Sequence, residues 1–169
     1  MTDERTLDQL LLTLREDKSA LAPIYQRLRR ELFSYAYSIL QNTDAANDAV
    51  SETMVRLCDA VGRYRANDQA RAYLYGICRR VSLEMCRHQK RQQPTDTLPE
   101  APTISDTDTR LDVQAMLGKL DEEERQIVVL HYFHDMTFKE ISRVLGSPEG
   151  TVKWRHTKAL EKCRVAANV

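Results

Sequence analysis

Apolar residues recur every three or four positions along most of the chain, which is the spacing of one face of an α-helix. The pattern begins with Leu7, Leu10, Leu11 and Leu14. It continues through three longer stretches, 22–40, 44–61 and 70–90, which we expect to be helices. Strands are not expected, because β-branched residues are sparse and no Asn-Gly or Asp-Gly hairpin turn occurs. The pattern therefore predicts an all-α protein.

Each long stretch has an apolar face that would point into the core of a helical bundle. In 22–40 this face comprises Tyr25, Leu28, Leu32, Phe33, Tyr35, Ala36 and Ile39. In 44–61 it comprises Ala46, Ala49, Val50, Met54, Leu57 and Cys58. In 70–90 it comprises Tyr73, Leu74, Ile77, Cys78, Val81 and Met85. A polar loop, 62–69, joins the last two helices.

Capping signals mark the helices near the C-terminus. A short helix is indicated by Leu111, Met116, Leu117 and Leu120. Asp121 is expected to cap the next helix, with Glu124 three residues later as in a capping box. The apolar face of that helix comprises Ile127, Val128, Leu130 and Tyr132.

A second capping box begins at Thr137 and predicts a helix that runs to Leu145. Gly146 then supplies a left-handed turn residue, and Ser147 and Pro148 are expected to restart a helix, with Ser147 as its N-cap. Two short helices joined by such a turn form a helix-turn-helix pattern, in which the second helix enters the major groove of DNA.

The second helix of this pattern is basic and is expected to face DNA. Its inner face would hold Val152, packed against Ile141 and Leu145 of the first helix. Its exposed positions would be Glu149, Lys153, Trp154, Thr157 and Lys158. The residues placed to contact phosphates are Lys153, Arg155, Lys158, Lys162 and Arg164. A helical hairpin that merely packs in a bundle is the alternative, but the capping box, the glycine turn, the Ser-Pro restart and the basic helix together favour DNA binding.

A segment of different composition separates the two helical parts. Residues 94–112 hold three prolines, several Ser and Thr residues and few side chains that could pack a core. We expect a flexible linker there, between a first domain at 1–93 and a second domain at 113–169.

The formal net charge is zero, but the charges are unevenly distributed along the chain. The linker 94–112 carries five acidic residues and one arginine. Residues 76–93 carry five basic residues and one acid, and residues 137–164 carry seven basic residues and three acids. Two basic clusters are thus separated by an acidic spacer, which suits contacts with a polyanion at two places. Two solvated helix faces are the alternative, and the charge pattern by itself favours it.

The sequence disfavours several classes of protein. It holds no Gly-rich phosphate loop and its four histidines are scattered, so an enzyme is not expected. The four cysteines lack metal-ligand spacing and are expected to be free thiols, so neither a metal nor another cofactor is predicted. No apolar run is long enough for a membrane helix, and the charged N-terminal stretch lacks the features of a signal peptide, which predicts a cytoplasmic protein.

The loop 62–69 and the helix after it combine basic, amide and aromatic side chains. The loop offers Arg63, Tyr64, Arg65, Asn67 and Gln69. The helix offers Tyr73, Tyr75, Arg79, Arg80 and Arg87. Such side chains suit unstacked, single-stranded bases. Ordinary packing of half-buried tyrosines is the alternative, and these residues by themselves favour it.

The whole arrangement resembles the extracytoplasmic-function (group IV) family of bacterial RNA polymerase sigma factors. The segment DAANDAVSETMVRL (44–57) is similar to the family's polymerase-binding helix, and residues 64–91 are similar to its −10 promoter segment. Residues 120–164 resemble its −35 domain, most specifically in the run EISRVLGSPEGTVKWR. The resemblance covers nearly the whole chain.

The resemblance implies two helical domains on a flexible linker, which bind the clamp and flap of core RNA polymerase and read promoter DNA. It implies polymerase binding by Asp48, Ser51, Glu52 and Arg56. It implies −10 recognition and melting by Arg63, Tyr64, Asn67, Tyr73, Arg79, Arg80 and Arg87. It implies −35 recognition by Glu149, Lys153, Trp154, Arg155, Thr157 and Lys158. An anti-sigma factor is a further implied partner.

Some positions depart from the residues usual in the family, and two other functions stay open. The departures are Asn47, Ser51, Gly76 and Arg80. One alternative is a regulator that binds duplex DNA through the helix-turn-helix without RNA polymerase. The other is a sigma-like protein that sequesters an anti-sigma factor without starting transcription.

Overall fold

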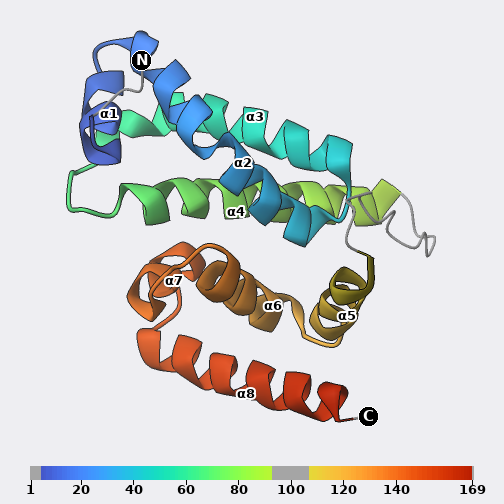
Figure 1. Ribbon diagram of the computed structural model, residues 1–169. Helices are drawn as coiled ribbons and strands as arrows, with labels where there is room; N and C mark the ends of the chain where they lie inside the picture. The colour runs from blue at the N-terminus through green and yellow to red at the C-terminus, as the bar shows by residue number, and fades with distance from the viewer. Residues whose placement is uncertain (1–4, 93–106, 169) are drawn as a thin grey trace. The chain divides into compact units, whose positions relative to one another are not determined.

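The computed structural model describes residues 5–92 and 107–168, and every regular element in these two ranges is a helix (Figure 1). The predicted all-α class is therefore confirmed for them. The chain divides into two compact units, Met1–Leu98 and Pro99–Val169, and the dividing point falls inside the predicted linker. Residues 94–106 of that linker lie outside the described ranges, so their flexibility stays a prediction.

The described part of the first unit consists of α1 (Leu7–Leu14), η1 (Lys18–Ala20), α2 (Leu21–Leu40), α3 (Thr43–Ala60), η2 (Val61–Arg63) and α4 (Ala70–Gln92). Local hydrogen bonds set where these helices begin and end. Thr6 and Gln9 form a capping box at the start of α1. The Asn42 side chain accepts a hydrogen bond from the backbone N–H of Ala45 and so caps α3. α2 ends where Gln41 adopts a left-handed conformation, with φ 55°.

The core of the first unit lies among α2, α3 and α4, which pack on one another, and α1 lies against α2 and α4 (Figure 1). Its largest fully buried side chains are Leu10, Leu11, Ile24, Leu32, Tyr35, Leu57, Leu74 and Tyr75. Burial of one such side chain contributes about 1.5–3 kcal/mol. The predicted apolar faces are wrong at Tyr25, which is 39% exposed, because the neighbouring Ile24 takes the core position.

A polar contact also joins α2 to α4. The hydroxyl of buried Tyr75 donates a hydrogen bond of 2.9 Å to Glu31 Oε2, and Arg71 Nη2 lies 3.2 Å from the same oxygen. The Arg71 guanidinium also lies over the Tyr75 ring, 5.5 Å from its centroid. Glu31 therefore supplies the acceptor that a buried hydroxyl needs.

The described part of the second unit consists of α5 (Thr107–Gly118), α6 (Glu122–Val128), the π-helix η3 (Val129–Phe133), α7 (Phe138–Leu145) and α8 (Glu149–Ala167). α5 begins inside the segment predicted as a linker, so that prediction is wrong for residues 107–112. Composition identifies the linker by its prolines, and none follows Pro102 in this stretch to block a helix.

Both capping boxes predicted for the second unit are confirmed. Asp121 and Glu124 form one at the start of α6, and Thr137 and Glu140 form the other at the start of α7. In each, the side chain of the first residue accepts a hydrogen bond from the backbone N–H of the glutamate, and the glutamate carboxylate accepts one from the backbone N–H of the first residue. Two backbone donors are thereby satisfied.

The turn between α7 and α8 differs from the prediction in one detail. Gly146 ends α7 in a left-handed conformation with φ 65°, as expected. Ser147 does not cap α8, because the N-cap residue is Pro148, which makes no side-chain capping hydrogen bond. The Ser147 carbonyl oxygen instead accepts a hydrogen bond of 2.6 Å from the Ser142 hydroxyl. This bond ties α7 to the residue that leads into α8.

The π-helix η3 widens the helical turn between α6 and α7. Its last two residues, Tyr132 and Phe133, are 52% and 57% exposed, although the apolar pattern places Tyr132 inside. The wider turn moves them off the face on which Val129 and Leu130 are buried. The core of the unit comprises Leu120, Ile127, Val128, Leu130, Met136, Ile141, Val152 and Ala159.

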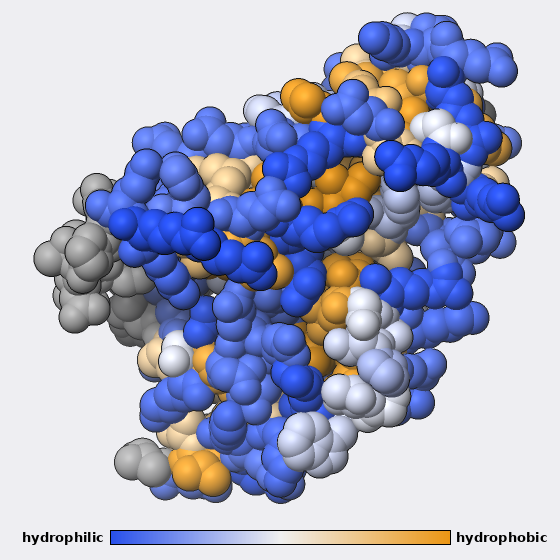
Figure 2. Space-filling model, turned by 180° about the vertical axis from the view of Figure 1, so that it is seen from behind, coloured by the Kyte–Doolittle hydropathy of each residue, from blue (hydrophilic) through white to orange (hydrophobic). Residues whose placement is uncertain are grey.

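On the face shown in Figure 2, hydrophilic residues cover most of the surface and hydrophobic residues form separate patches. Within the described ranges, no helix is both long enough and apolar enough to cross a membrane. In the same residues, no group of three or more His, Cys, Asp or Glu side chains is placed to hold a metal ion.

Candidate nucleic-acid and polymerase interfaces

The outer face of α8 carries the positions that the sequence assigns to DNA. The exposed residues on it are Glu149, Lys153, Trp154, Thr157 and Lys158. The Trp154 indole is 61% exposed, and the Lys158 ammonium lies 5.9 Å from its ring centroid. Lys153 pairs with Glu149 one turn away, at 3.0 Å. Val152 is fully buried on the opposite face, so the orientation of α8 is fixed by packing.

Two further basic residues of α8 are held by α6. Arg155 forms a salt bridge with Glu123, and the Arg155 side chain is 33% exposed. Lys162 Nζ lies 2.7 Å from an oxygen of Glu124, whose side chain is only 7% exposed. The hydrogen bond to Glu124 favours the charged ammonium and raises the pKa of Lys162. Both cations therefore brace α8 against α6.

The aromatic seam of the second unit is formed by His131, Tyr132, Phe138 and His156. The His131 ring stacks on Phe138 with 4.6 Å between centroids, and His131 Nδ1 donates a hydrogen bond to the Met136 carbonyl oxygen. The Tyr132 hydroxyl lies 2.9 Å from His156 Nε2. Burial, and then the nearby His131, lower the pKa of His156. His156 is thus a neutral packing residue at the edge of the core.

The loop between α3 and α4 holds the first of the predicted −10 residues. Arg63 and Asn67 are exposed. Tyr64 is only 4% exposed, since its ring packs on Tyr73 with 4.8 Å between centroids and its hydroxyl donates a hydrogen bond to the Asp8 carboxylate. Tyr73 itself is half-buried. The loop offers Arg63 and Asn67 to a ligand, and the first turn of α4 offers part of Tyr73, whereas Tyr64 is buried.

The following helix, α4, has a basic outer face. Arg80 and Arg87 are exposed and Arg79 is half-buried. Glu84 lies among them in sequence, and its Oε2 is 2.6 Å from Arg56 Nη2 of α3. This hydrogen bond lowers the pKa of Glu84, which is therefore ionised and paired at neutral pH. A cation from α3 thus offsets the one acidic charge in the basic stretch of α4.

The predicted polymerase-binding residues lie along α3. Asp48 and Ser51 are exposed. Arg56 bridges two acids, since its Nε is 2.9 Å from Glu52 and its Nη2 contacts Glu84. These hydrogen bonds, to Glu84 first, raise the pKa of Arg56. Arg56 and Glu52 are therefore part of a link between α3 and α4 as well as of the α3 surface.

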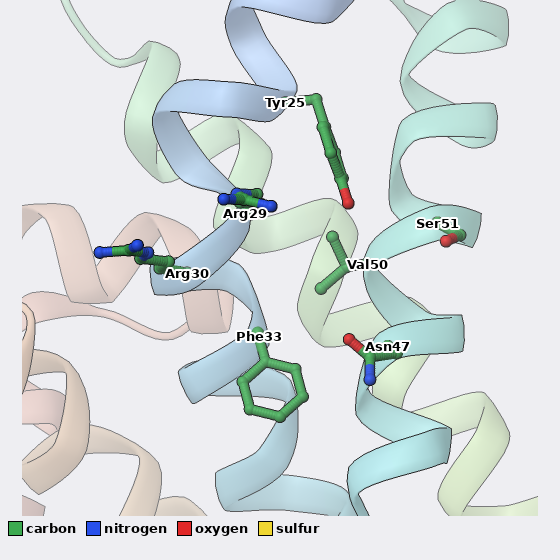
Figure 3. A pocket seen from close by; sticks show the side chains of 7 residues that line it. All are labelled: Tyr25, Arg29, Arg30, Phe33, Asn47, Val50 and Ser51. Carbon is green, nitrogen blue, oxygen red and sulfur yellow. The ribbon is translucent and has the colours of Figure 1, made fainter.

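A pocket of about 450 Å³ lies between α2 and α3, and we call it the α2–α3 pocket. It is lined by Tyr25, Arg29, Arg30, Phe33, Asn47, Val50 and Ser51. Figure 3 shows Tyr25 and Phe33 extending from α2 on the side of α3, and Val50 extending from α3. Arg29 and Arg30 are exposed beside this apolar lining. The pocket thus joins an aromatic surface to a cationic rim.

The α2 side of this pocket is missed by the sequence analysis. Tyr25 and Phe33 fit the helical periodicity, so the pattern assigns both to the core. The available signal is the adjacent pair Arg29 and Arg30, because two cations beside an apolar stripe place its edge at the surface.

Two family models match the chain. The model for Sigma-70 region 2 matches residues 24–92, which span most of α2 and all of α3, the loop and α4. The model for Sigma-70 region 4 matches residues 116–165, which span the end of α5 and the helices up to α8. Together the two matches cover more than half of the chain, and each falls within one unit.

Curated relatives align along most of the chain. The RNA polymerase sigma factor SigV of Bacillus subtilis is 26% identical over 142 residues, which cover 81% of this chain and 84% of that protein. The ECF RNA polymerase sigma factor SigM of Mycobacterium tuberculosis is 28% identical over 147 residues, which cover 85% of this chain and 74% of that protein.

Solved structures show the same fold. CnrH, in its complex with the cytosolic domain of CnrY, matches with a TM-score of 0.73 and 21% identity, over 95% of this chain and 96% of that chain. The sigma factor RpoE from Bartonella quintana, in complex with the anti-sigma factor NepR, matches with a TM-score of 0.71 and 20% identity, over 86% and 97%. Regions 2 and 4 of Sigma-70 are both present, and curated sigma factors align along most of the chain. The chain therefore belongs to the sigma-70 family of RNA polymerase sigma factors, in the extracytoplasmic-function group.

Proposed function

We propose that this protein binds core RNA polymerase and directs transcription initiation at promoters that it reads at two elements, −35 as duplex and −10 as melted DNA. The observation that carries the proposal is the pairing, in one chain, of regions 2 and 4, each with an exposed basic surface. Such a role needs no covalent chemistry. It needs phosphate contacts for affinity and side chains that read bases.

In the second unit, α8 enters the major groove of the −35 element. The contacting residues are Glu149, Lys153, Trp154, Thr157 and Lys158. Lys153 and Lys158 supply the salt-dependent attraction to phosphates. Arg155 can contact a phosphate only if it first gives up its salt bridge with Glu123. The contribution of Arg155 to DNA affinity is therefore smaller than its charge suggests.

In the first unit, the loop and α4 hold the melted −10 strand. Arg63, Asn67 and Tyr73 are the exposed or half-exposed residues that contact an unstacked base. The phosphate contacts fall to Arg79, Arg80 and Arg87 of α4. Capture of the base must offset the few kcal/mol that unstacking costs, which favours the opened strand over the duplex.

The polymerase contact extends from α3 across the α2–α3 pocket. Asp48 and Ser51 are its exposed residues on α3, with Glu52 and Arg56 beside them. Arg29 and Arg30 on the rim complement an acidic partner surface, and Tyr25 offers an aromatic anchor of the kind that dominates interfaces. The clamp of the polymerase is the partner proposed for this face, and the flap is the partner proposed for the second unit.

We also propose an anti-sigma factor as a regulatory partner and the cytoplasm as the site of action. The support for the first is that CnrH and RpoE, which share this fold, were both solved as complexes, RpoE with an anti-sigma factor. The cytoplasm is supported by the proposed function, because a protein that binds RNA polymerase and promoter DNA must act in the compartment that holds both.

The decisive experiment is run-off transcription with core bacterial polymerase, this protein and promoter fragments of the source genome, with permanganate detection of unpaired thymines. We expect specific transcripts and melted thymines near −10. A variant with Lys153→Ala and Trp154→Ala should lose transcription at promoters with a −35 element. Lys18→Ala is the matched control, because Lys18 is exposed on η1 and lies on neither proposed surface.

Two results would contradict the proposal. Duplex binding without any polymerase complex would identify a plain helix-turn-helix regulator. Polymerase or anti-sigma binding without melted thymines would identify a sigma-like decoy, and would direct attention to Asn47, Ser51, Gly76 and Arg80.

A further inference from the structure

The N-terminal helix α1 holds the loop between α3 and α4 at two points. The Asp8 carboxylate accepts the hydrogen bond of the Tyr64 hydroxyl, across 56 positions of sequence. Arg15, just after α1, donates from Nε to the Val61 carbonyl oxygen at 3.1 Å. The Sigma-70 region 2 match begins at residue 24, so both residues lie outside it.

Tyr64 links α1 to the exposed part of the loop through its side-chain contacts. Its ring lies against Tyr73, and its hydroxyl faces Asp8, so one side chain connects α1 to α4. Burial, followed by the hydrogen bond to Asp8, raises the pKa of Tyr64, which keeps the hydroxyl protonated as a donor. The Tyr73 hydroxyl in turn lies in the field of Arg80, Arg63 and Arg15.

The loop has few other backbone restraints. The backbone N–H of Tyr64 donates to the Val61 carbonyl oxygen at 3.0 Å, and the backbone N–H of Tyr73 donates to the Gln69 carbonyl oxygen at 2.9 Å. These two hydrogen bonds fix the two ends of the loop. Between these points, Asp68 adopts a left-handed conformation with φ 57°. A loop so built depends on side-chain contacts for its position, and order present before binding reduces the entropy lost when a ligand binds.

We propose that Asp8 and Arg15 are positioning residues for −10 recognition, which act through Tyr64 and Val61 to hold Arg63, Asn67 and Tyr73 in place for the melted strand. The proposal rests on the proposed function, since it assumes that this loop captures a base. It assigns to α1 a role in promoter opening. The sequence of α1 predicts only an amphipathic, leucine-rich helix and gives no sign of this role.

The test compares Asp8→Ala, Asp8→Asn, Tyr64→Phe and the double variant Asp8→Ala/Tyr64→Phe. The readouts are open-complex formation by permanganate, affinity for core polymerase, and thermal unfolding of the full-length protein. Removing one net hydrogen bond corresponds to roughly a 3- to 10-fold change, so Asp8→Ala and Tyr64→Phe should each lower open-complex formation by about that factor. The double variant should lose no more than either single variant, because both remove the same contact.

Asp8→Asn should recover most of the loss, since an amide oxygen still accepts from the tyrosine hydroxyl. Glu16→Ala is the matched control, as Glu16 is an exposed acid two positions after α1. An Asp8→Ala protein no weaker in opening than Glu16→Ala would overturn the proposal. So would a loss that Asp8→Asn does not relieve, or one matched by equal losses of polymerase affinity and thermal stability.

Arg15 is tested by Arg15→Met, which keeps the aliphatic stem and removes the donor. The expected result is a smaller drop in opening, because the Val61 carbonyl faces an exposed side chain and water can replace the bond. Amide hydrogen exchange of residues 61–69 measures directly how firmly α1 holds the loop. Exchange of these amides should be faster in Asp8→Ala than in Glu16→Ala. If the unaltered protein opened no promoter, the proposed function would fail, and this exchange would still show whether α1 holds the loop.

Discussion

At the scale of single residues, four of the five basic side chains of α8 fall into two groups by the acids that they pair with. Lys153 and Lys158 are exposed and pair with acids of their own helix, contacts that contribute about 0.3–0.5 kcal/mol. Arg155 and Lys162 pair with acids of α6. All four have the same charge and lie on one helix, so charge alone does not distinguish a DNA contact from a brace.

Lys153→Ala and Arg155→Ala should separate these roles. Lys153→Ala should weaken duplex binding and reduce the slope of log affinity against log salt by about 1, because one phosphate contact is lost. Arg155→Ala should instead lower the free energy of unfolding of the second unit, by up to about 1 kcal/mol for a partly exposed pair. Urea unfolding followed by the fluorescence of Trp154, the single tryptophan, reports on that unit. Equal effects of both variants on stability would contradict the division.

Cys78 should be the slowest of the four cysteines to react with a thiol reagent. It is fully buried, and burial raises its pKa to about 11 despite opposing hydrogen bonds from Thr53 and Ser82. At pH 8 it therefore holds almost no reactive thiolate, whereas Cys58 and Cys86 are only half-buried. Timed labelling at pH 8 with mass spectrometry should find Cys78 modified only after denaturant is added. Labelling of Cys78 in the folded protein as fast as Cys86 would show that α4 opens locally.

Tyr64 shows where residue-level prediction stops. Its type and its basic neighbours suit a base-stacking residue, and the sequence holds no sign that Asp8, 56 positions earlier, will accept its hydroxyl. Long-range pairing of this kind depends on the fold. The exposed positions Arg63 and Asn67 were predictable, because polar and charged side chains in a connecting loop remain at the surface.

At the scale of elements, local signals predicted the helices well wherever the deciding contact lies within a few residues. The capping boxes at Thr137 and Asp121 are examples, since each is complete within four positions. The cap of α8 was mispredicted because the helix begins one residue later than the Ser-Pro signal suggests, with Pro148 at the N-cap position and Ser147 before it. The extent of α5 was mispredicted because low apolar content and nearby prolines resemble a linker even where the backbone is helical.

Gly146 should be the residue on which the helix-turn-helix geometry depends most. A side chain there has space, but its φ of 65° penalises any residue with a β-carbon. Gly146→Ala should destabilise the second unit by about 1–2 kcal/mol, and Gly146→Asn by less, since Asn tolerates the left-handed region.

Gly150→Ala is the matched control for this turn. Gly150 lies within α8 and also has open space, so alanine there should stabilise the helix by up to about 1 kcal/mol. Urea unfolding monitored at Trp154 measures all three variants. Destabilisation by both alanine variants would show that space, and not backbone conformation, is limiting.

At the scale of the whole molecule, zero net charge conceals two basic surfaces, one in each unit, and an acidic stretch between them in sequence. With no net charge, the protein as a whole has no strong attraction to a polyanion. The proposed DNA contacts fall instead on the loop, α4 and α8, where the cations are concentrated. The proposed attraction to DNA therefore depends on where the basic residues are placed and not on a large net positive charge.

Separating the units should separate the two binding activities. Residues 1–98 should bind core polymerase and not the −35 duplex, and residues 99–169 should bind the −35 duplex weakly and not the clamp, since each unit holds its own core. Neither piece should support run-off transcription, even when both are added as separate chains, because binding at one element no longer raises the local concentration of the other unit. Helicity by circular dichroism is the control for folding, and full activity of the mixed pieces would contradict the expectation.

The π-helix η3 has a consequence for how this chain tolerates length changes. A π turn is an α-helix that accommodates one added residue, so the five residues Val129–Phe133 could lose one and relax to ordinary helix. Each residue of an α-helix advances the chain by 1.5 Å and about 100°. The deletion would therefore rotate everything that follows it on the same helix, Tyr132 and Phe133 included. A variant that lacks one residue of this segment should therefore lose any surface that depends on the present exposed direction of Tyr132 and Phe133.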